Sequence, residues 1–259
     1  DHFPRDQGRG QWSCYGGTET GFHVSEGQDP LYPECAQFTQ DQGIEQSWRR
    51  GTEMKTQEIL DKLTELFPDA QCELVHRNPF ELAVAVTLSA QTTDVSVNRI
   101  TPALFAKYPT PQLMAEADIA DIEELIHSIG LYRKKARDIK GLAQGLVDMF
   151  DGEVPHTREE LTMLPGVGRK SANVIMSVCF NEPAIAVDTH VERVSKRLGL
   201  AKKDDTVLEV EKKLMRKIRK DEWCHAHHLF IFFGRYLCKA RQPECERCPF
   251  TSICKEYKK

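Results

Sequence analysis

The 259-residue sequence lacks an apolar run long enough to cross a lipid bilayer. A membrane-spanning helix needs about 20 consecutive apolar residues, and the longest apolar stretch, FELAVAVTLSA, is much shorter. The first residues, DHFPRDQGRG, lack the basic start and the apolar run of a signal peptide. We therefore expect a cytoplasmic protein that does not associate with membranes.

The cysteines lack the pattern of a disulfide framework, because there are nine of them and most have no obvious partner. Four fall within the last 22 residues, and the other five are scattered: Cys14, Cys35, Cys72, Cys179 and Cys224. This usage favours a reducing compartment, where disulfides are rare.

The chain also lacks a strong excess of positive charge, since its formal net charge is −4. Residues 1–53 carry nine acidic and four basic side chains, so the remaining residues, with 30 acidic and 31 basic, are nearly neutral. Any binding to nucleic acid must therefore come from a local basic patch.

Residues 1–53 have little that would fold. They contain eight of the 16 glycines and 13 hydrophobic residues without helical or strand periodicity, so we predict disorder. Two interpretations remain open. The segment is either a genuine disordered tail, or it is translated upstream sequence with Met54 as the natural start, since Arg49, Arg50 and Gly51 can be encoded by codons that resemble a ribosome-binding site.

After Met54 no convincing strand is found, and about ten helices are expected. MKTQEILDKLTELF places Ile59, Leu60, Leu63, Leu66 and Phe67 on one helical face. The composition and periodicity of the body therefore predict an all-α fold.

Local signals mark where several helices begin and end. Three capping boxes are expected, with Asn78, Thr157 and Thr206 as N-caps and Glu81, Glu160 and Glu209 as their partners. Gly130 and Gly152 suit helix ends, and Pro102 should kink or split its helix.

The segment LPGVGRKSANVIM resembles a phosphate-binding loop but fits neither nucleotide motif. A P-loop needs glycine before the lysine, and Arg169 precedes Lys170 instead. A capped helix rather than a strand precedes it. Gly166 and Gly168 allow a sharp turn whose N–H groups, with the start of the next helix, suit an anion. A nucleic-acid backbone fits this hairpin, and an ordinary helical connection remains the alternative.

Four cysteines crowd into CKARQPECERCPFTSIC. Cys238, Cys245, Cys248 and Cys254 are separated by six, two and five residues. Zinc ribbons usually have two close pairs of cysteines, whereas this segment has one, so the uneven spacing favours a 4Fe-4S cluster. Zinc remains the alternative.

Together the hairpin, Asp188 located 18 residues after Lys170, and the cysteine tail resemble the endonuclease III family of bifunctional DNA glycosylases and AP lyases. The resemblance covers residues 54–259. It implies two helical domains with a cleft between them: a six-helix domain over residues 72–182 with the helix-hairpin-helix motif, and a second domain of residues 54–71 plus 183–259 with the iron–sulfur cluster loop.

The resemblance implies that Lys170 is the nucleophile and that Asp188 stabilises the cationic sugar. The amine of Lys170 must be neutral to attack, and burial and a basic neighbour such as Arg169 would help. Alternatively Lys170 contacts phosphate and Asp188 caps the helix THVERVSKRLG; both roles of Asp188 can hold together.

DNA contacts are also carried over from the family. Gln91 and Leu131 match positions that fill the gap and wedge the duplex, and Lys239 and Arg241 match phosphate contacts. With Gly166, Gly168 and Arg169 of the hairpin, these complete the expected DNA-binding set. Lys134, Lys135 and Arg137 would extend the basic surface. The alternatives are a Gln91 that merely ends its helix, a packed Leu131 and a solvated charged face. Cys224 and His228 are four residues apart, but no metal is assigned to them.

The implied function is base excision repair: removal of oxidised pyrimidines from double-stranded DNA and cleavage of the abasic site by β-elimination. A monomeric, nucleoid-associated protein of bacterial type is expected. The rivals are an adenine-removing glycosylase, a non-catalytic DNA-binding module and a zinc-dependent regulator. Lys170 argues against the first, and the Lys170–Asp188 spacing argues against the second.

Overall fold

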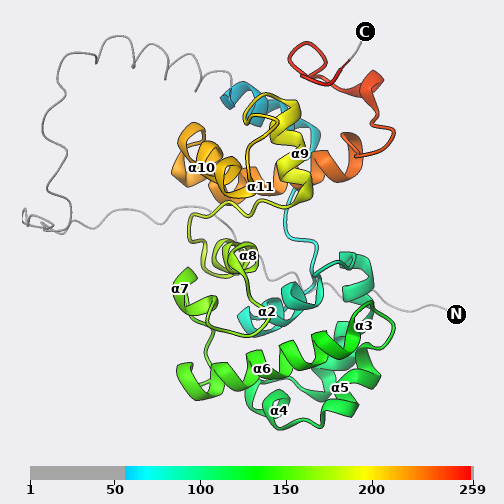
Figure 1. Cartoon of the computed structure of the whole chain (residues 1–259), viewed down its shortest axis with the longest axis vertical. Helices are drawn as coiled ribbons and strands as arrows, with labels where there is room; N and C mark the ends of the chain where they lie inside the picture. Colours follow the sequence, from blue (N-terminus) through cyan, green and yellow to red (C-terminus); the bar gives the residue numbers. More distant parts are fainter. Residues whose placement is uncertain (1–55, 258–259) are drawn as a thin grey trace, which may run out of the picture. The chain divides into compact units, whose positions relative to one another are not determined.

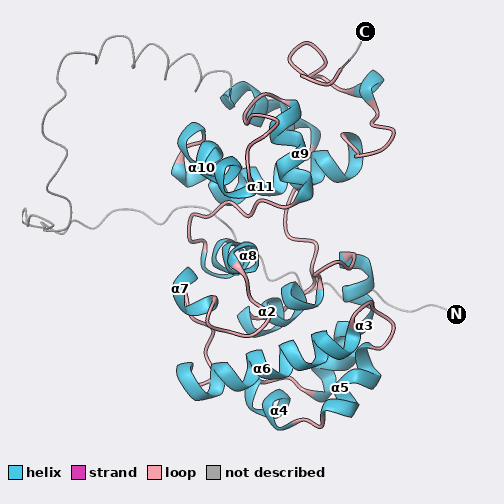
Figure 2. Cartoon of the chain, viewed as in Figure 1, coloured by secondary structure: helices cyan, strands magenta, loops and turns pink. Residues whose placement is uncertain are grey.

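The computed structural model describes residues 56–257. The expectations for residues 1–53 lie outside this range. Within it the chain forms helices and no strand (Figure 2), which confirms the all-α prediction. No helix in the described range is long and apolar enough to cross a membrane.

The first helix spans residues 56–66. The elements that follow in chain order are α2 (Pro79–Leu88), α3 (Asp94–Lys107), α4 (Pro111–Glu116), α5 (Ile119–Ile126), α6 (Tyr132–Phe150), α7 (Arg158–Leu161), α8 (Arg169–Phe180), α9 (Thr189–Arg197), α10 (Val207–Lys217), the 3₁₀ turn η1 (Lys220–Glu222), α11 (Trp223–Phe232), the π-helical segment η2 (Phe233–Leu237) and the 3₁₀ turn η3 (Cys245–Arg247).

A first hydrophobic core collects buried side chains from Leu74 to Ile175, on helices α2 to α8. The long helix α6 packs against α2, α4 and α5, and α2 also packs against α8 (Figure 1). Helix α2 is apolar on all sides, and nine of its ten residues are buried. Such a helix suits the centre of a helical domain, and it gives α8 a fixed surface to rest on.

A second hydrophobic core joins the helix over residues 56–66 to side chains between Ile185 and Phe250. Here α9 packs against α10, α11 and η2. The division into domains at residues 72–182 stays a prediction. That range contains seven α-helices rather than the six implied by the resemblance, because Thr157 caps an additional single turn, α7.

Some local predictions are confirmed and others are wrong. Thr206 and Glu209 form a complete capping box. Asn78 caps α2, but the Glu81 carboxylate accepts from the Arg77 N–H at 2.8 Å instead of completing the box. Thr157 caps α7 but its hydroxyl donates to the Glu160 carboxylate at 2.7 Å.

Three further positions correct the sequence-based view. Leu66 is 39% exposed rather than part of the buried face, because its helix ends there. Pro102 lies inside α3 without splitting it, so the expected split is wrong and the expected kink stays a prediction. Gly130 lies in a turn beyond the end of α5, whereas Gly152, with a φ of +83°, follows the end of α6 as expected.

Candidate functional site

The glycine hairpin connects α7 to α8 by a turn that only glycine fits. Val167 donates its N–H to the Leu164 carbonyl at 3.1 Å, which closes the turn. Gly166 has a φ of +78°, and a Cβ there would lie 2.7 Å from Thr87 Cγ2 on α2 and 3.0 Å from Asp138 Cβ on α6. The missing side chain therefore lets the turn lie directly on α2 and α6.

The second glycine faces open space. Gly168 is the N-cap of α8, has no side-chain cap and would place a Cβ with nothing within 4 Å. The first N–H groups of a helix have no intrahelical acceptor, and here no side chain covers them. The start of α8 can therefore approach an anion closely.

Lys170 and Asp188 line the same cleft, which has a volume of about 1060 Å³ and also includes Gln91. Lys170 lies in the first turn of α8 and Asp188 is the N-cap of α9. Lys170 is exposed at the cleft, so the expectation that it is buried is wrong. Two residues that are 18 positions apart thus reach one site from the starts of consecutive helices.

Most charges that line the cleft are paired. Arg235 forms ion pairs with Glu73 and with Asp94, the latter at 2.9 Å. Lys196 Nζ lies 2.6 Å from a carboxylate oxygen of Glu192. These two cations therefore offset two of the three carboxylate charges at the cleft.

Lys170 and Asp188 differ from these groups, because neither forms an ion pair with any residue between 56 and 257. Asp188 Oδ1 accepts the N–H groups of His190 and Val191, both at 2.8 Å. This confirms the capping role. Its other oxygen accepts no hydrogen bond from the described residues. The site therefore presents one uncommitted amine and one carboxylate oxygen to a ligand.

A smaller pocket of about 80 Å³ is also lined by Lys170 and Asp188, together with His227 and His228 of α11. Burial, the neighbouring His228 and the charge of Lys170 hold the pKa of His227 well below its usual value. Burial and the nearby His225 lower the pKa of His228 to about 4. Both imidazoles are therefore neutral at neutral pH, and they add no charge to the pocket.

Arg169 does not point freely to the cleft. Its guanidinium donates to both carboxylate oxygens of Glu211 on α10, at 3.0 and 2.6 Å. The Glu211 side chain is 4% exposed and that of Arg169 is 47% exposed. The expected DNA contact of Arg169 thus competes with a two-point ion pair that joins the start of α8 to α10.

Gln91 and Leu131 have left-handed backbone conformations, with φ of 53° and 59°. Non-glycine residues rarely adopt this region. Gln91 lines the cleft, whereas Leu131 does not. Leu131 is 60% exposed at the start of α6, so it does not merely pack on the preceding helix end.

The remaining basic residues named from sequence separate into different environments. Lys135 is buried, and its expected place on a basic surface is therefore wrong. Arg137 is exposed, and Lys134 pairs with Asp138 at 2.6 Å. Lys239 is exposed and pairs with Glu244 at 2.7 Å; Arg241 is exposed in the same loop.

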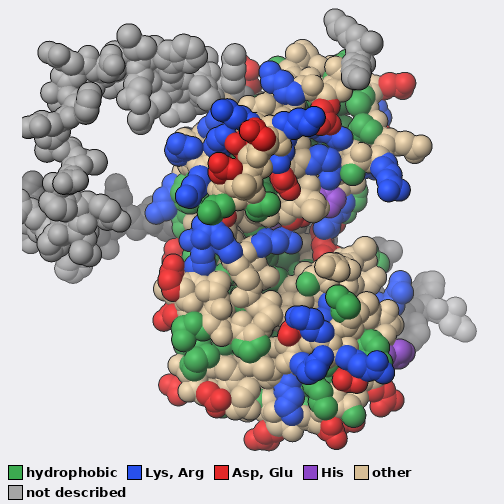
Figure 3. All heavy atoms as spheres, in the orientation of Figure 1, with side chains coloured by type: hydrophobic (Ala, Val, Ile, Leu, Met, Phe, Trp, Pro, Cys, Tyr) green, Lys and Arg blue, Asp and Glu red, His purple; other side chains and the backbone are tan. Residues whose placement is uncertain are grey.

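On the face shown in Figure 3, lysines and arginines gather around α9 and α10 and along the border with α8. Acidic side chains are interspersed with them there, and others lie near α4 and α7. This distribution supplies a local basic surface on a chain whose net charge is slightly negative.

Cys238, Cys245, Cys248 and Cys254 line one cavity of about 300 Å³. Burial and the other three thiols raise the pKa of Cys248, and Arg197 donates to the Cys238 sulfur at 3.3 Å. No three His, Cys, Asp or Glu side chains of the described range converge on a single ion position.

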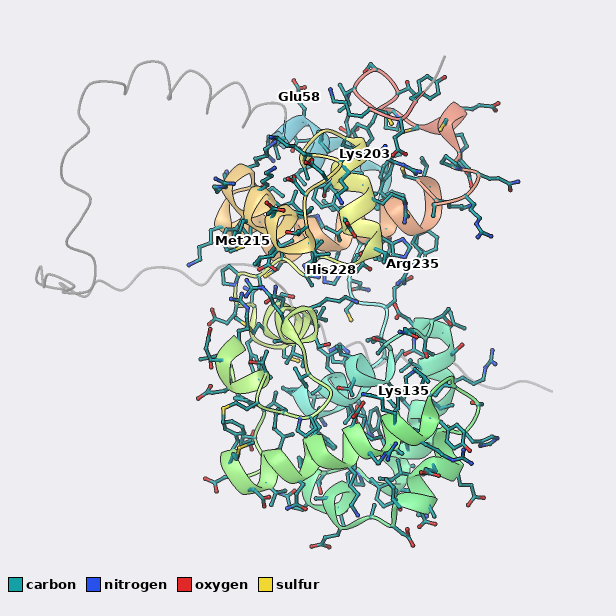
Figure 4. The ribbon with its side chains drawn as sticks, viewed as in Figure 1. Glu58, Lys135, Lys203, Met215, His228 and Arg235 are labelled. Carbon is teal, nitrogen blue, oxygen red and sulfur yellow. The ribbon has the colours of Figure 1, made fainter. Side chains whose placement is uncertain are left out.

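Sequence reasoning missed Arg235 and His227, and it considered His228 only as a metal ligand. Arg235 lies in η2, where Gly234 packs so closely on α9 that a Cβ would be 2.9 Å from His190 Cβ. The helices of the first core, α2 to α8, form a first helical group, and the helices of the second core form a second one. Figure 4 shows Arg235 and His228 near the border between these two helical groups. No sequence pattern marks a π-helical segment, although the adjacent Gly234 was a visible signal of close backbone approach.

Comparisons with known proteins agree with this geometry. A family model described as HhH-GPD superfamily base excision DNA repair protein matches residues 84–220. Endonuclease III of Bacillus subtilis (strain 168) is 57% identical over 200 residues, which cover 77% of this chain and 91% of that protein.

Two solved structures are also similar, each with a TM-score of 0.77 and 57% sequence identity. One is a trapped endonuclease III–DNA covalent intermediate, and the similarity covers 79% of this chain and 96% of that chain. The other is a non-covalent endonuclease III–DNA complex, with 79% and 95% covered.

The two hairpin glycines are expected to respond differently to alanine. Gly166→Ala introduces strain at positive φ and a clash with Thr87, so thermal denaturation should show a loss of about 1–3 kcal/mol of stability. Gly168→Ala has open space and an extended backbone, so its melting temperature should stay close to that of the wild type. Equal melting temperatures for both variants would contradict this reading of the turn.

Proposed function

The chain belongs to the endonuclease III family within the HhH-GPD superfamily of base excision DNA repair proteins, and on this basis we propose that it removes oxidised pyrimidines from duplex DNA and cleaves the resulting abasic site. Lys170 is the nucleophile and Asp188 stabilises the cationic sugar. The observation that carries the proposal is the pair of uncommitted groups, Lys170 and Asp188, at one cleft. The covalent DNA intermediate of a 57% identical relative supports it.

The reaction begins once the damaged nucleotide has left the base stack. The Lys170 amine attacks C1′ of the sugar. The bond from C1′ to the base breaks, and its electron pair leaves with the base, which takes up a proton. The sugar then opens to a Schiff base with Lys170, and removal of a proton from C2′ expels the 3′ phosphate by β-elimination.

Asp188 serves this chemistry with the oxygen that does not cap α9. A carboxylate close to C1′ stabilises the positive charge that develops as the base departs. Its first oxygen is held by the His190 and Val191 N–H groups, so the side chain is oriented before DNA binds. Asp188 is also placed to relay protons between the amine, the sugar and solvent.

DNA binding rests on several exposed groups. The uncapped start of α8, with Gly166 and Gly168 in its turn, contacts the phosphate backbone without reading sequence. Gln91 fills the space that the extruded nucleotide leaves and Leu131 wedges the neighbouring stack. Lys239 and Arg241 add phosphate contacts from the cysteine loop, provided that Lys239 exchanges Glu244 for phosphate.

We further propose that the four tail cysteines hold a 4Fe-4S cluster. The support is the cavity that all four cysteines line, together with their separation by six, two and five residues, which contains one close pair. When bound, the cluster supplies four covalent links that fold the loop carrying Lys239 and Arg241. It takes no part in the bond changes, because neither Lys170 nor Asp188 lines that cavity.

The nucleophile is tested by borohydride trapping. Borohydride reduces a Schiff base to a stable amine, so wild-type protein should become covalently linked to DNA that contains an oxidised pyrimidine, and nicking should accompany base loss. Lys170→Gln should bind the same DNA but neither become trapped nor nick it. A trapped complex with Lys170→Gln would show that another amine is the nucleophile.

The two roles of Asp188 are separated by comparing kinetics with melting. Asp188→Asn keeps an oxygen that caps α9 but loses the charge, so the melting temperature should change little. Loss of one preorganised electrostatic group lowers the rate by about 10²–10³, whereas loss of a cap alone costs about 1 kcal/mol of stability. A variant that melts early and retains its single-turnover rate would leave Asp188 with the capping role only.

The cluster is tested by composition. Purified protein should be yellow-brown, with broad absorbance near about 400 nm and about four irons per chain. Cys245→Ser should lower both iron content and melting temperature, while Cys224→Ser should change neither the colour nor the iron content. Colourless, zinc-containing protein with full activity would contradict the assignment.

A further inference from the structure

Five non-glycine residues of the described range have left-handed backbone conformations. Asp151 and Asn181 are ordinary C-caps of α6 and α8, and Gln242 lies in the cysteine loop. Gln91 and Leu131 have no such helix-ending role. Leu131 is both strained and 60% exposed, which is a costly combination for a branched apolar residue.

One residue connects the loops that carry these two residues, through its side chain to one loop and through its backbone to the other. Lys135 Nζ donates a hydrogen bond to Thr92 Oγ1, next to Gln91. The Lys135 backbone N–H donates to the Leu131 carbonyl at 3.0 Å, in the first turn of α6. Lys135 thus touches both loops, although Thr92 is 43 residues away in sequence.

Lys135 is an unusual choice for this position. The residue is 3% exposed, and no carboxylate between residues 56 and 257 forms an ion pair with it. Burial lowers its pKa. An apolar side chain of similar length would fill the same space without the cost of burying a charge. The hydrogen bond from the Lys135 amine to Thr92 is therefore the feature that an apolar side chain could not supply.

We propose that Lys135 is a positioning residue that ties the Gln91 and Leu131 loops into one rigid element, so that both side chains enter the DNA stack together. The hydrogen bond to Thr92 fixes the end of the Gln91 loop, and the first turn of α6 fixes Leu131 (Figure 4 labels Lys135 in this region). Preorganised loops enter the duplex without first being ordered. The inference rests on the roles given above to Gln91 and Leu131.

The test uses full-length protein and a duplex with a tetrahydrofuran abasic-site analogue opposite 2-aminopurine. This probe has no base to release and no aldehyde, so its signal depends neither on lesion specificity nor on Lys170. Fluorescence after stopped-flow mixing reports insertion into the stack. Lys135→Met keeps the straight side chain and removes the amine. It should slow insertion about 10- to 100-fold, since small misplacements have effects of that size.

Three further results are expected if Lys135 acts by positioning. The melting temperature of Lys135→Met should not fall, because the variant removes a buried charge. The Kd for DNA should stay within about threefold, because the phosphate contacts remain. Thr92→Val should reproduce the slow insertion and Thr92→Ser, which keeps the hydroxyl, should restore it.

Lys140→Met is the matched control. Lys140 lies on the same helix and donates to the Ala117 carbonyl, not to a residue of the Gln91 loop. The Lys140→Met variant should insert its Gln91 and Leu131 side chains into the stack at the wild-type rate. If Lys140→Met and Lys135→Met slow insertion equally and both lower the melting temperature, Lys135 is merely structural and the proposal is overturned.

Coupling is measured with Gln91→Ala and Leu131→Ala. In the wild-type background the free-energy effects of the two substitutions on insertion should be non-additive. In the Lys135→Met background they should be additive, so that the two fold-changes in the insertion rate multiply. If both alanine variants slow insertion but Lys135→Met does not, the positioning role falls and the proposed function stands. If neither alanine variant slows insertion, the roles of Gln91 and Leu131 fail and the proposal for Lys135 fails with them.

Discussion

The absence of a Cβ at Gly166 determines the position of the Lys170 amine, the proposed nucleophile. The turn lies against Thr87 on α2 and Asp138 on α6 at distances that a side chain would occupy. Helix α2 is buried on all sides and α6 is the longest helix of its group, so both are firm supports. Helix α8 begins at Arg169, directly after Gly168, and Lys170 lies in its first turn. The hydrophobic core formed by α2 to α8 therefore sets the position of the Lys170 amine at the cleft.

The second helical group supplies the Asp188 carboxylate, which is also positioned by the start of a helix. Asp188 ends an extended segment and caps α9, so the start of a helix again determines the direction of a functional group. The Arg169–Glu211 ion pair and the pairs of Arg235 with Glu73 and Asp94 connect the segments that face the cleft. Such partly buried pairs add modest stability. Their larger effect is to define one relative placement of α8, α10, α3 and η2, on which the geometry of the amine and the carboxylate depends.

Sequence alone predicted the features whose interacting residues lie close together in the chain. Asn78 and Thr206 were identified as caps, because a cap and its N–H donors lie within three residues. The cysteine loop and the Lys170–Asp188 pair followed from spacing and resemblance. The missed features have distant partners: Glu211 is 42 residues from Arg169, Thr92 is 43 from Lys135 and Glu73 is 162 from Arg235. Local pattern carries no information about such contacts, so Lys135 was taken for a surface residue and Arg169 for a free one.

The charges of the cleft explain how a site with four carboxylates can accept a polyanion. Arg235 pairs with both Glu73 and Asp94 and offsets one of their two negative charges, and Lys196 offsets the charge of Glu192. Asp188 is the one lining carboxylate that no cation of residues 56–257 pairs with, and Lys170 is its unpaired counterpart. The ion pairs thus reduce the repulsion that a DNA backbone meets near the cleft, while Asp188, the carboxylate proposed to stabilise the cationic sugar, keeps its full charge. Because the other lining carboxylates each have a cation partner, Asp188 is the carboxylate that remains available to a positive charge developing in the ligand.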